Sequence, residues 1–131
     1  MSQENVEIVR RMYEAFNDEG VAGTLDYYAD EIVWHSDPRF PGGGTYKGKE
    51  RAAEYMQSLI DYWEHVELRV EELIPKGDQV LAILTSHNVG REGVTMDSFW
   101  AHLWTVADGK MQDVRSFLDR EAALQAAGLS E

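Results

Sequence analysis

The chain has 131 residues, of which 44% are hydrophobic, so it is long enough to form one domain around its own apolar core. It contains no cysteine, which excludes disulfide bonds, thiolate metal ligands and cysteine nucleophiles. Its 24 acidic and 12 basic residues give a formal net charge of −12, which disfavours binding to nucleic acid or to an anionic membrane surface.

The start of the chain lacks the features of a signal peptide. Residues 1–5 are polar and include neither a basic nor an apolar region. No apolar run reaches the roughly 18 residues that would suggest a membrane span. We therefore expect a cytoplasmic protein that does not bind membranes.

The first part of the chain shows the hydrophobic spacing of helices. Ser2 can cap a first helix, whose apolar residues recur at helical spacing and which should end near Gly20. A short second helix is expected around residues 21–28, before a strand over residues 32–35. A third helix is expected over residues 49–63. The glycine-rich stretch at residues 41–44 lacks the residues of a phosphate-binding loop and predicts a mobile rim loop.

From His65 onward, apolar and polar residues alternate, as is typical of strands. Residues 75–78 predict a turn, and two long strands are expected over residues 79–89 and 94–106. Asp108-Gly109-Lys110 predicts a tight hairpin that leads into a last strand over residues 111–118. Asp119 should then cap a final helix that ends at Gly128.

Helices followed by an antiparallel meander predict one α+β domain over residues 1–131, with the helices packed on a strongly bent sheet.

The strand over residues 94–106 has no polar face. One face would carry Ser98, Trp100, His102 and Trp104. The other face would carry Asp97, Phe99, Ala101 and Leu103. If helices cover one face, the other face also needs a cover, and we expect a homodimer packed sheet to sheet. The alternative is a monomer that exposes a tryptophan.

Four segments of the chain resemble a known family: VEIVRRMYEAFN, YADEIVWH, YKGKE and DGKMQDVRSFLDREAALQAAGL. In the same order, they are similar to segments of the SnoaL-like, polyketide cyclase-like branch of the nuclear transport factor 2-like (ketosteroid isomerase-like) superfamily. The resemblance covers nearly the whole chain and implies a cystatin-like cone with an apolar cavity, commonly in a homodimer. It does not define the function, because this fold hosts isomerases, cyclases, epoxide hydrolases, dehydratases and members that only bind or scaffold.

The resemblance to the ketosteroid isomerases implies roles for individual residues. Tyr13 falls where these enzymes carry an oxyanion-hole tyrosine, and Tyr55 where they carry a supporting tyrosine. The position of their general base corresponds to Asp37 if one residue is inserted, and to Ser36 without the insertion.

Two expected catalytic carboxylates are missing from the chain. Ala101 falls at the second, acidic oxyanion donor of the isomerases, and Ser116 at the catalytic aspartate of the cyclases and epoxide hydrolases. Asp97 lies on the same side of its strand as Ala101 and could stand in for a carboxylate. The catalytic sets of the superfamily are therefore incomplete in this chain.

An acid/base pair could lie beside the rim loop. Histidine titrates near neutral pH, and His35 is followed two positions later by Asp37. These two could share a proton at the cavity mouth while Tyr13 donates a hydrogen bond from the floor. Alternatively, His35 faces outward because it alternates with Trp34, and Asp37 bonds only within its own loop.

The predicted function is the binding of a small apolar organic ligand in the cone cavity. Catalytic candidates are His35, Asp37 and Tyr13, and ligand-binding candidates are Trp34, Tyr55, Asp97, Phe99 and Ser116. We expect no cofactor and no metal, because neither a cofactor motif nor a metal-binding spacing is present, and we assign His87 and His102 to packing. If the protein is an enzyme, we expect cofactor-free isomerase, cyclase or hydratase/hydrolase chemistry. The alternative is a non-catalytic binding or dimerisation module.

Overall fold

The structure is a computed structural model that describes residues 2–40 and 42–129. Its helices are α1 (Ser2–Glu19), α2 (Val21–Thr24), α3 (Lys49–Ile60) and α4 (Arg120–Ala126), with short 3₁₀ helices η1 (Leu25–Tyr27) and η2 (Arg91–Gly93). Its strands are β1 (Tyr28–His35), β2 (Thr45–Lys47), β3 (His65–Lys76), β4 (Gln79–Val89), β5 (Thr95–Ala107) and β6 (Lys110–Phe117). No helix in the described ranges is both long enough and apolar enough to cross a membrane.

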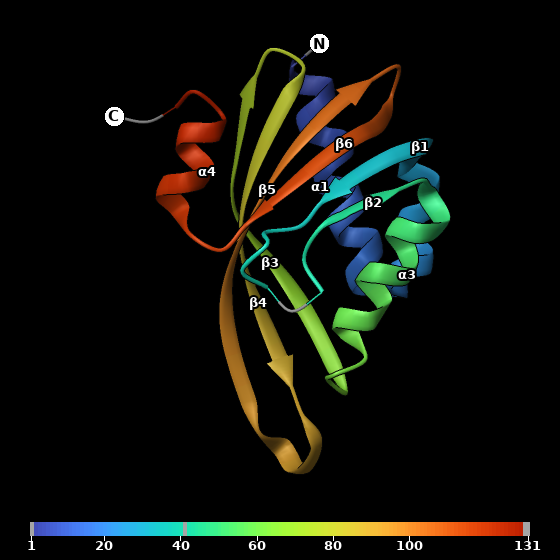
Figure 1. The fold of residues 1–131 in the computed structure, drawn as a ribbon, viewed down its shortest axis with the longest axis vertical. Coiled ribbons are helices and arrows are strands. Elements are labelled where there is room, and N and C mark those ends of the chain that lie inside the picture. Colours follow the sequence, from blue (N-terminus) through green and yellow to red (C-terminus); the bar gives the residue numbers. More distant parts are fainter. Residues whose placement is uncertain (1, 41, 130–131) are drawn as a thin grey trace.

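The six strands form one curved sheet in the order β2-β1-β6-β5-β4-β3. Neighbouring strands are antiparallel, except for β1 and β6, which run parallel. Helices α1 and α3 lie on one side of the sheet and α4 lies on the other (Figure 1). We call the side of α1 and α3 the inner face and the side of α4 the outer face. The predicted α+β arrangement of helices on a bent sheet is confirmed.

The larger hydrophobic core lies between the inner face and the helices. Trp104 of β5 and Leu84 of β4 are fully buried there, together with Val9 of α1. Residues of α1 reach the sheet because its apolar positions form one stripe along the helix. Alternate residues of β4 and β5 point into the same space because successive side chains of a strand face opposite sides.

A smaller core lies on the outer face under α4. Leu81, Ala101 and Leu103 of the sheet pack there against Ala123 and Ala127. The second cover that the sequence assigns to another copy of the chain is thus supplied in part by the chain's own C-terminal helix. The inner face, which carries Trp100, His102 and Trp104, is covered by α1 and α3.

The short-range signals in the sequence are confirmed at the C-terminal end of the chain. The φ angles of Asp108 and Gly109 are 54° and 75°, which is the left-handed conformation that a tight two-residue hairpin requires. Asp119 caps α4, because its Oδ1 atom accepts a hydrogen bond of 2.8 Å from the backbone N–H of Ala122.

Element boundaries differ from the prediction where the alternation of residues is interrupted. Strand β1 begins at Tyr28 rather than Ile32, and its register against β6 shifts between Tyr28 and Val33. This irregularity hides the alternation from the sequence pattern. Strand β3 continues past the predicted turn residue Pro75, and α3 ends at Ile60 rather than near residue 63.

Candidate functional site

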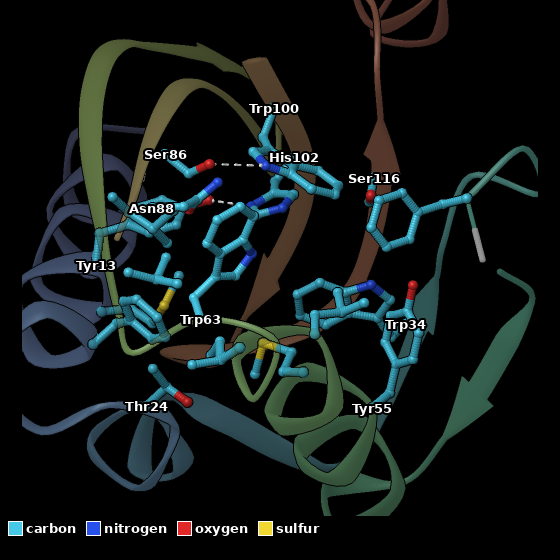
Figure 2. Close-up of a pocket in the computed structure, with 18 of the residues that line it drawn as sticks. Tyr13, Thr24, Trp34, Tyr55, Trp63, Ser86, Asn88, Trp100, His102 and Ser116 are labelled. Carbon is cyan, nitrogen blue, oxygen red and sulfur yellow. Dashed lines mark hydrogen bonds between the residues drawn. The ribbon is translucent and has the colours of Figure 1, made fainter. Parts of the chain in front are cut away.

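An apolar cavity of about 120 Å³ lies between α1, α3 and the inner face of the sheet (Figure 2). None of its lining residues within residues 2–40 and 42–129 is an aspartate, glutamate, lysine or arginine. The aromatic residues that line it are Tyr13, Phe16, Tyr28, Trp34, Phe40, Tyr55, Trp63, Trp100 and His102. The cavity therefore has the concave, mostly apolar character of small-molecule sites.

Three side chains at the floor of the cavity form a hydrogen-bonded chain. Trp104 Nε1 donates to the hydroxyl of Tyr13 at 2.8 Å. The same hydroxyl lies 2.7 Å from Nδ1 of His102 (Figure 2). An indole N–H can only donate, so the Tyr13 oxygen accepts from Trp104. Because the described residues offer the Tyr13 hydroxyl proton no acceptor other than Nδ1 of His102, we assign this proton to the bond with His102. Nδ1 is then the acceptor, and the proton of the neutral ring sits on Nε2.

The hydrogen-bonded chain of these three side chains is built from two periodicities, that of a strand and that of a helix. His102 and Trp104 are two residues apart on β5, so both side chains reach the inner face. Tyr13 lies on the buried stripe of α1, between Val9 and Phe16. Helix and strand meet where these two apolar patterns face each other.

Burial keeps His102 and Tyr13, the two ionisable members of this hydrogen-bonded chain, neutral. His102 is only 8% exposed, and burial lowers the pKa of its imidazole to about 4 because the charged ring would lose its hydration. Burial also raises the pKa of Tyr13 well above its ordinary value, although the hydrogen bond from Trp104 acts in the opposite direction. At neutral pH the whole chain of side chains is therefore uncharged.

Further polar groups lie at the edge of the cavity. Ser86 Oγ accepts a hydrogen bond of 3.2 Å from Trp100 Nε1, and Ser116 lines the cavity from β6. Trp34 is 4% exposed, and within the described residues its indole nitrogen is the one fully buried side-chain nitrogen or oxygen without a hydrogen-bond partner. Leaving such a group unpaired costs about 1–3 kcal/mol, which an acceptor that reached it would recover.

The loop after β1 closes one side of the cavity mouth. The ring of Phe40 packs edge-on against Trp100 with 5.2 Å between the ring centroids, and both residues line the cavity. Gly43 is tightly packed within this loop, because a Cβ atom there would collide with the carbonyl oxygen of Asp37. Pro41, the first residue of the predicted rim loop, lies outside the described residues.

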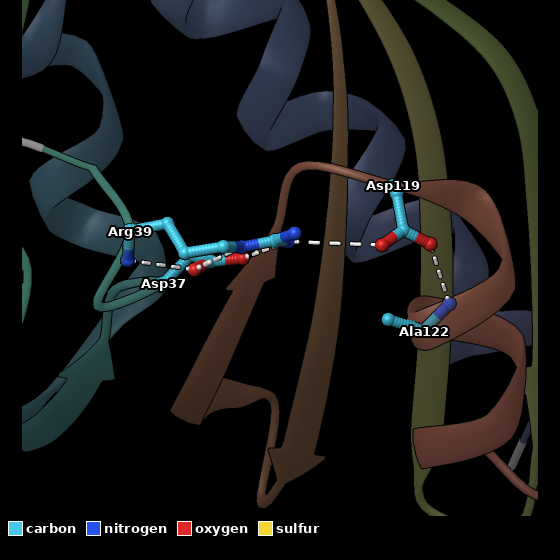
Figure 3. A network of polar contacts seen from close by, with 4 residues as sticks. All are labelled: Asp37, Arg39, Asp119 and Ala122. Carbon is cyan, nitrogen blue, oxygen red and sulfur yellow. Dashed lines mark hydrogen bonds and ion pairs between the residues drawn. The ribbon is translucent and has the colours of Figure 1, made fainter.

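An ion-pair network anchors the same loop to the C-terminal helix (Figure 3). The guanidinium of Arg39 donates to the carboxylate of Asp37 at 3.0 Å through Nε and at 2.7 Å through Nη2. Nη2 also lies 3.7 Å from Oδ2 of Asp119, the cap of α4. The hydrogen bonds from Arg39 lower the pKa of Asp37 to about 2, so this side chain is a paired carboxylate at neutral pH.

Four of the residues predicted from the sequence meet in the cavity. Tyr13, Trp34, Tyr55 and Ser116 all line it. Tyr55 is additionally hydrogen-bonded through its hydroxyl to Ser36. These residues come from a helix, a strand, a second helix and a second strand, so the fold brings together segments that are distant in the sequence.

The other predicted residues lie elsewhere. His35 follows the inward-facing Trp34 on β1 and therefore faces outward, where its Nε2 lies 2.9 Å from Oδ1 of Asp113. Asp37 is held by Arg39, so the expected proton-sharing pair of His35 and Asp37 is not formed in the structure.

Two predicted ligand-binding residues lie on the outer face of β5. Asp97 is paired there with Nδ1 of His87 at 2.6 Å, and Phe99 packs beside the small core under α4. They cannot touch a ligand in the cavity, because odd-numbered residues of this strand point away from it.

His102 lines the cavity, although the sequence pattern assigns it only to packing. It shares its side of β5 with Trp100 and Trp104, but two apolar strand faces look alike in a sequence until the position of the helices is known. Ala101, the position inferred for the missing acidic donor, faces α4. The next residue, His102, faces inward. A shift of one residue in the alignment with the isomerases would place their acidic donor at His102.

Comparison with known proteins agrees with this architecture. The family model of the SnoaL-like domain matches residues 9–114. TerC, co-crystallised with polyporic acid, is 23% identical and superposes with a TM-score of 0.78 over 96% of this chain and 97% of that chain. An NTF2-like protein of unknown function from Burkholderia pseudomallei K96243 is 20% identical, with a TM-score of 0.77 over 96% of both chains.

A Mycobacterium tuberculosis protein in complex with estradiol-17beta-hemisuccinate has the same fold. It is 20% identical to this chain, with a TM-score of 0.72 over 88% of this chain and 94% of that chain. No curated protein matches the sequence. The similar structures thus support the cone fold of helices on a bent sheet.

Proposed function

The chain belongs to the SnoaL-like domain family, and from this premise we propose that it binds a small organic molecule in the cavity between α1, α3 and the sheet. The observation that carries the proposal is an aromatic cavity, without a charged lining residue among those described, built around the buried side chain of His102. TerC with polyporic acid and the Mycobacterium tuberculosis protein with an estradiol derivative support it, because both hold an organic molecule on a similar fold.

Binding without catalysis is the function that this cavity supports best. No carboxylate lines it within the described residues, so proton transfer inside it would fall to His102 and Tyr13. His102 carries its proton on the nitrogen that is not bonded to Tyr13, which makes it a donor rather than a base. His35 and Asp37 are engaged with partners outside the cavity and are not included in the proposed site.

Replacing Ser116 by leucine is expected to abolish ligand binding, because the larger side chain would occupy a cavity of only about 120 Å³. Native mass spectrometry of protein purified from cells, compared before and after denaturation, reports a bound small molecule. Tryptophan fluorescence gives a second readout with a panel of neutral one-ring and two-ring compounds, since three of the four tryptophans line the cavity.

The matched control is Ser58→Leu, the same substitution at an exposed position of α3 that does not line the cavity. It should bind the same compounds as the unaltered protein. If the Ser116→Leu protein binds them as tightly as the Ser58→Leu protein does, the cavity is not the ligand site.

The homodimer expected from the sequence remains part of the proposal, with the outer face as the contact surface. Phe99 and Phe117 lie there half-buried beside α4, and the guanidinium of Arg115 lies 5.7 Å from the centre of the Phe117 ring. These groups extend the small outer core toward the sheet surface, where a second copy would complete their burial.

Replacing Phe99 by aspartate is expected to convert this dimer into a monomer, because a carboxylate would be desolvated at the centre of the contact. Native mass spectrometry or light scattering measures the mass of the assembly. Tyr62→Asp is the control, since Tyr62 is 80% exposed and lies beyond the end of α3. A monomeric unaltered protein, or a Phe99→Asp protein that stays dimeric, would contradict this interface.

A further inference from the structure

The hydrogen-bonded chain at the cavity floor has a direction, and it ends on one atom. The indole of Trp104 donates to Tyr13, and Tyr13 donates to Nδ1 of His102, so the remaining proton of the imidazole is on Nε2. This nitrogen has no hydrogen-bond partner among the described residues. Nε2 is not one of the fully buried unpaired side-chain atoms, and His102 is one of the residues that line the cavity.

We propose that the ligand is a neutral carbonyl compound about the size of one six-membered ring, whose oxygen accepts a hydrogen bond from Nε2–H of His102. This inference rests on the proposed function and specifies the chemical class of the ligand. It also assigns the contact to His102 rather than to Tyr13, because the single hydroxyl proton of Tyr13 is already donated within the protein.

The charge of the site indicates a neutral ligand. Within the described residues, no lining side chain carries a charge that could offset that of a carboxylate or an ammonium group. Burying an ion without a partner costs far more than burying a neutral polar group. The formal net charge of −12 further disfavours an anion.

The hydrogen-bonding capacity of the site indicates a carbonyl group. Nε2–H of His102 needs an acceptor, and a carbonyl oxygen accepts without bringing a proton of its own. A hydroxyl or an amine would introduce a donor of its own, which would need an acceptor such as Ser86 or Ser116 at the edge of the cavity. The indole N–H of Trp34 is also unpaired, but it is enclosed by neighbouring atoms and is not reachable from the cavity in this structure.

The volume of the cavity indicates one ring. An engineered apolar cavity of about 150 Å³ accepts benzene, and the cavity of about 120 Å³ in this chain is of similar size. Phe40 and Trp100, which both line the cavity, pack against each other with 5.2 Å between their ring centroids.

The proposal is tested with three compounds of the same shape: cyclohexanone, methylenecyclohexane and cyclohexanecarboxylate. Titrations followed by tryptophan fluorescence or by NMR should show that the ketone binds about three- to tenfold more tightly than the alkene, as expected for one neutral hydrogen bond. The carboxylate should show no binding. The carbonyl stretching frequency of the bound ketone should lie below that of the ketone in an apolar solvent, which reports the hydrogen bond directly.

Two variants identify the donor. His102→Leu removes Nε2–H and puts no other donor in its place, so the preference for the ketone should disappear while the alkene still binds. Trp34→Phe removes the enclosed N–H and should keep the preference. In the unaltered protein, ¹⁵N NMR of His102 should show a protonated Nε2 and an unprotonated Nδ1, a result that does not depend on how well a variant folds.

The outcomes separate this inference from the function on which it rests. Equal binding of ketone and alkene, or loss of the ketone preference in Trp34→Phe alone, would overturn the assignment to His102 and leave ligand binding in the cavity intact. If neither compound binds to the unaltered protein, both the inference and the proposed function fail.

Discussion

Replacing Trp104 by alanine is expected to lower the free energy of unfolding by about 3–5 kcal/mol, the range measured when large buried aromatic residues are truncated. Trp104 is fully buried in the inner core. Its ring stacks on Tyr28 at 5.9 Å between centroids and packs edge-on against Trp34 at 5.8 Å. The truncation would leave a void among groups from α1, β1 and β5 that cannot all close around it.

The same substitution removes a hydrogen bond. Without the indole N–H of Trp104, the Tyr13 oxygen loses the donor that sets the direction of the chain to His102. Leaving a buried acceptor unpaired adds about 1–3 kcal/mol when no water replaces the donor. The expected effect of Trp104→Ala therefore lies toward the upper end of the range for its size.

Chemical denaturation of the purified variant measures this loss as a shift in the transition midpoint. The matched control is Trp63→Ala, which removes the same side chain from a half-buried position at the edge of the cavity. Because the Trp63 ring is partly exposed, its truncation should cost clearly less. A loss in Trp104→Ala no larger than that in Trp63→Ala would contradict this prediction.

Strand β5 shows how far the sequence predicts this fold. The alternation of its residues predicts a strand, since side chains on a pleated strand face alternate sides. It does not predict which side faces the helices, because Trp100 and Trp104 on one side and Phe99 and Leu103 on the other are equally apolar. That choice depends on how α1 and α4 pack, which is a property of the whole chain.

Signals confined to a few neighbouring residues are the most reliable. The hairpin at Asp108 and Gly109 and the cap at Asp119 are determined by backbone conformations and hydrogen bonds within four residues. Strand β2 was not predicted, since it is short and its pairing with β1 depends on a distant segment. A three-residue strand has too few positions for an alternation to be recognised.

The candidate site also combines residues that the sequence identifies with residues that only the packing of the fold identifies. Tyr13 and Tyr55 were identified through the family resemblance, and both line the cavity. His35 was a catalytic candidate because of its chemistry, but its position next to Trp34 on β1 directs it outward. His102 has suitable chemistry and faces the cavity. Its orientation becomes evident only from the packing of α1 against β5.

Stability and the proposed ligand binding depend on the same three side chains. Trp104 and Tyr13 hold Nδ1 of His102 as an acceptor, which leaves Nε2–H for the cavity. A protonated His102 would carry hydrogen on both nitrogens and could no longer accept from Tyr13. The protonation of this one residue should therefore affect the stability of the fold as well as the binding of a ligand.

Acidification from pH 6.5 to pH 4 is expected to cost the protein up to about 3 kcal/mol through His102 alone. Burial lowers the pKa of His102 to about 4 in the folded protein, whereas the ordinary value of 6.5 applies in the unfolded chain. Each pKa unit of difference corresponds to about 1.4 kcal/mol. Between the two values the unfolded chain binds a proton that the folded protein does not, so unfolding becomes easier as the pH falls.

The limits of this window distinguish His102 from other groups. Above pH 6.5 both states are neutral at this residue, and below pH 4 both are protonated, so its contribution is fully present above the window and fully lost below it. The paired carboxylate of Asp37, with its pKa lowered to about 2, loses its stabilising contribution only below its ordinary value of 3.8. The effects of the two residues therefore fall in successive pH ranges.

Denaturation curves recorded across this range should show a steep loss of stability in the unaltered protein and a much flatter profile in His102→Asn. Asparagine keeps an acceptor for the Tyr13 hydroxyl but cannot titrate, so the difference between the two profiles isolates the imidazole. His65→Asn is the control, because His65 is exposed and its removal should leave the steep profile unchanged. A His102→Asn profile as steep as that of the unaltered protein would mean that His102 is not held neutral by burial, and the direction of the hydrogen-bonded chain would then be wrong as well.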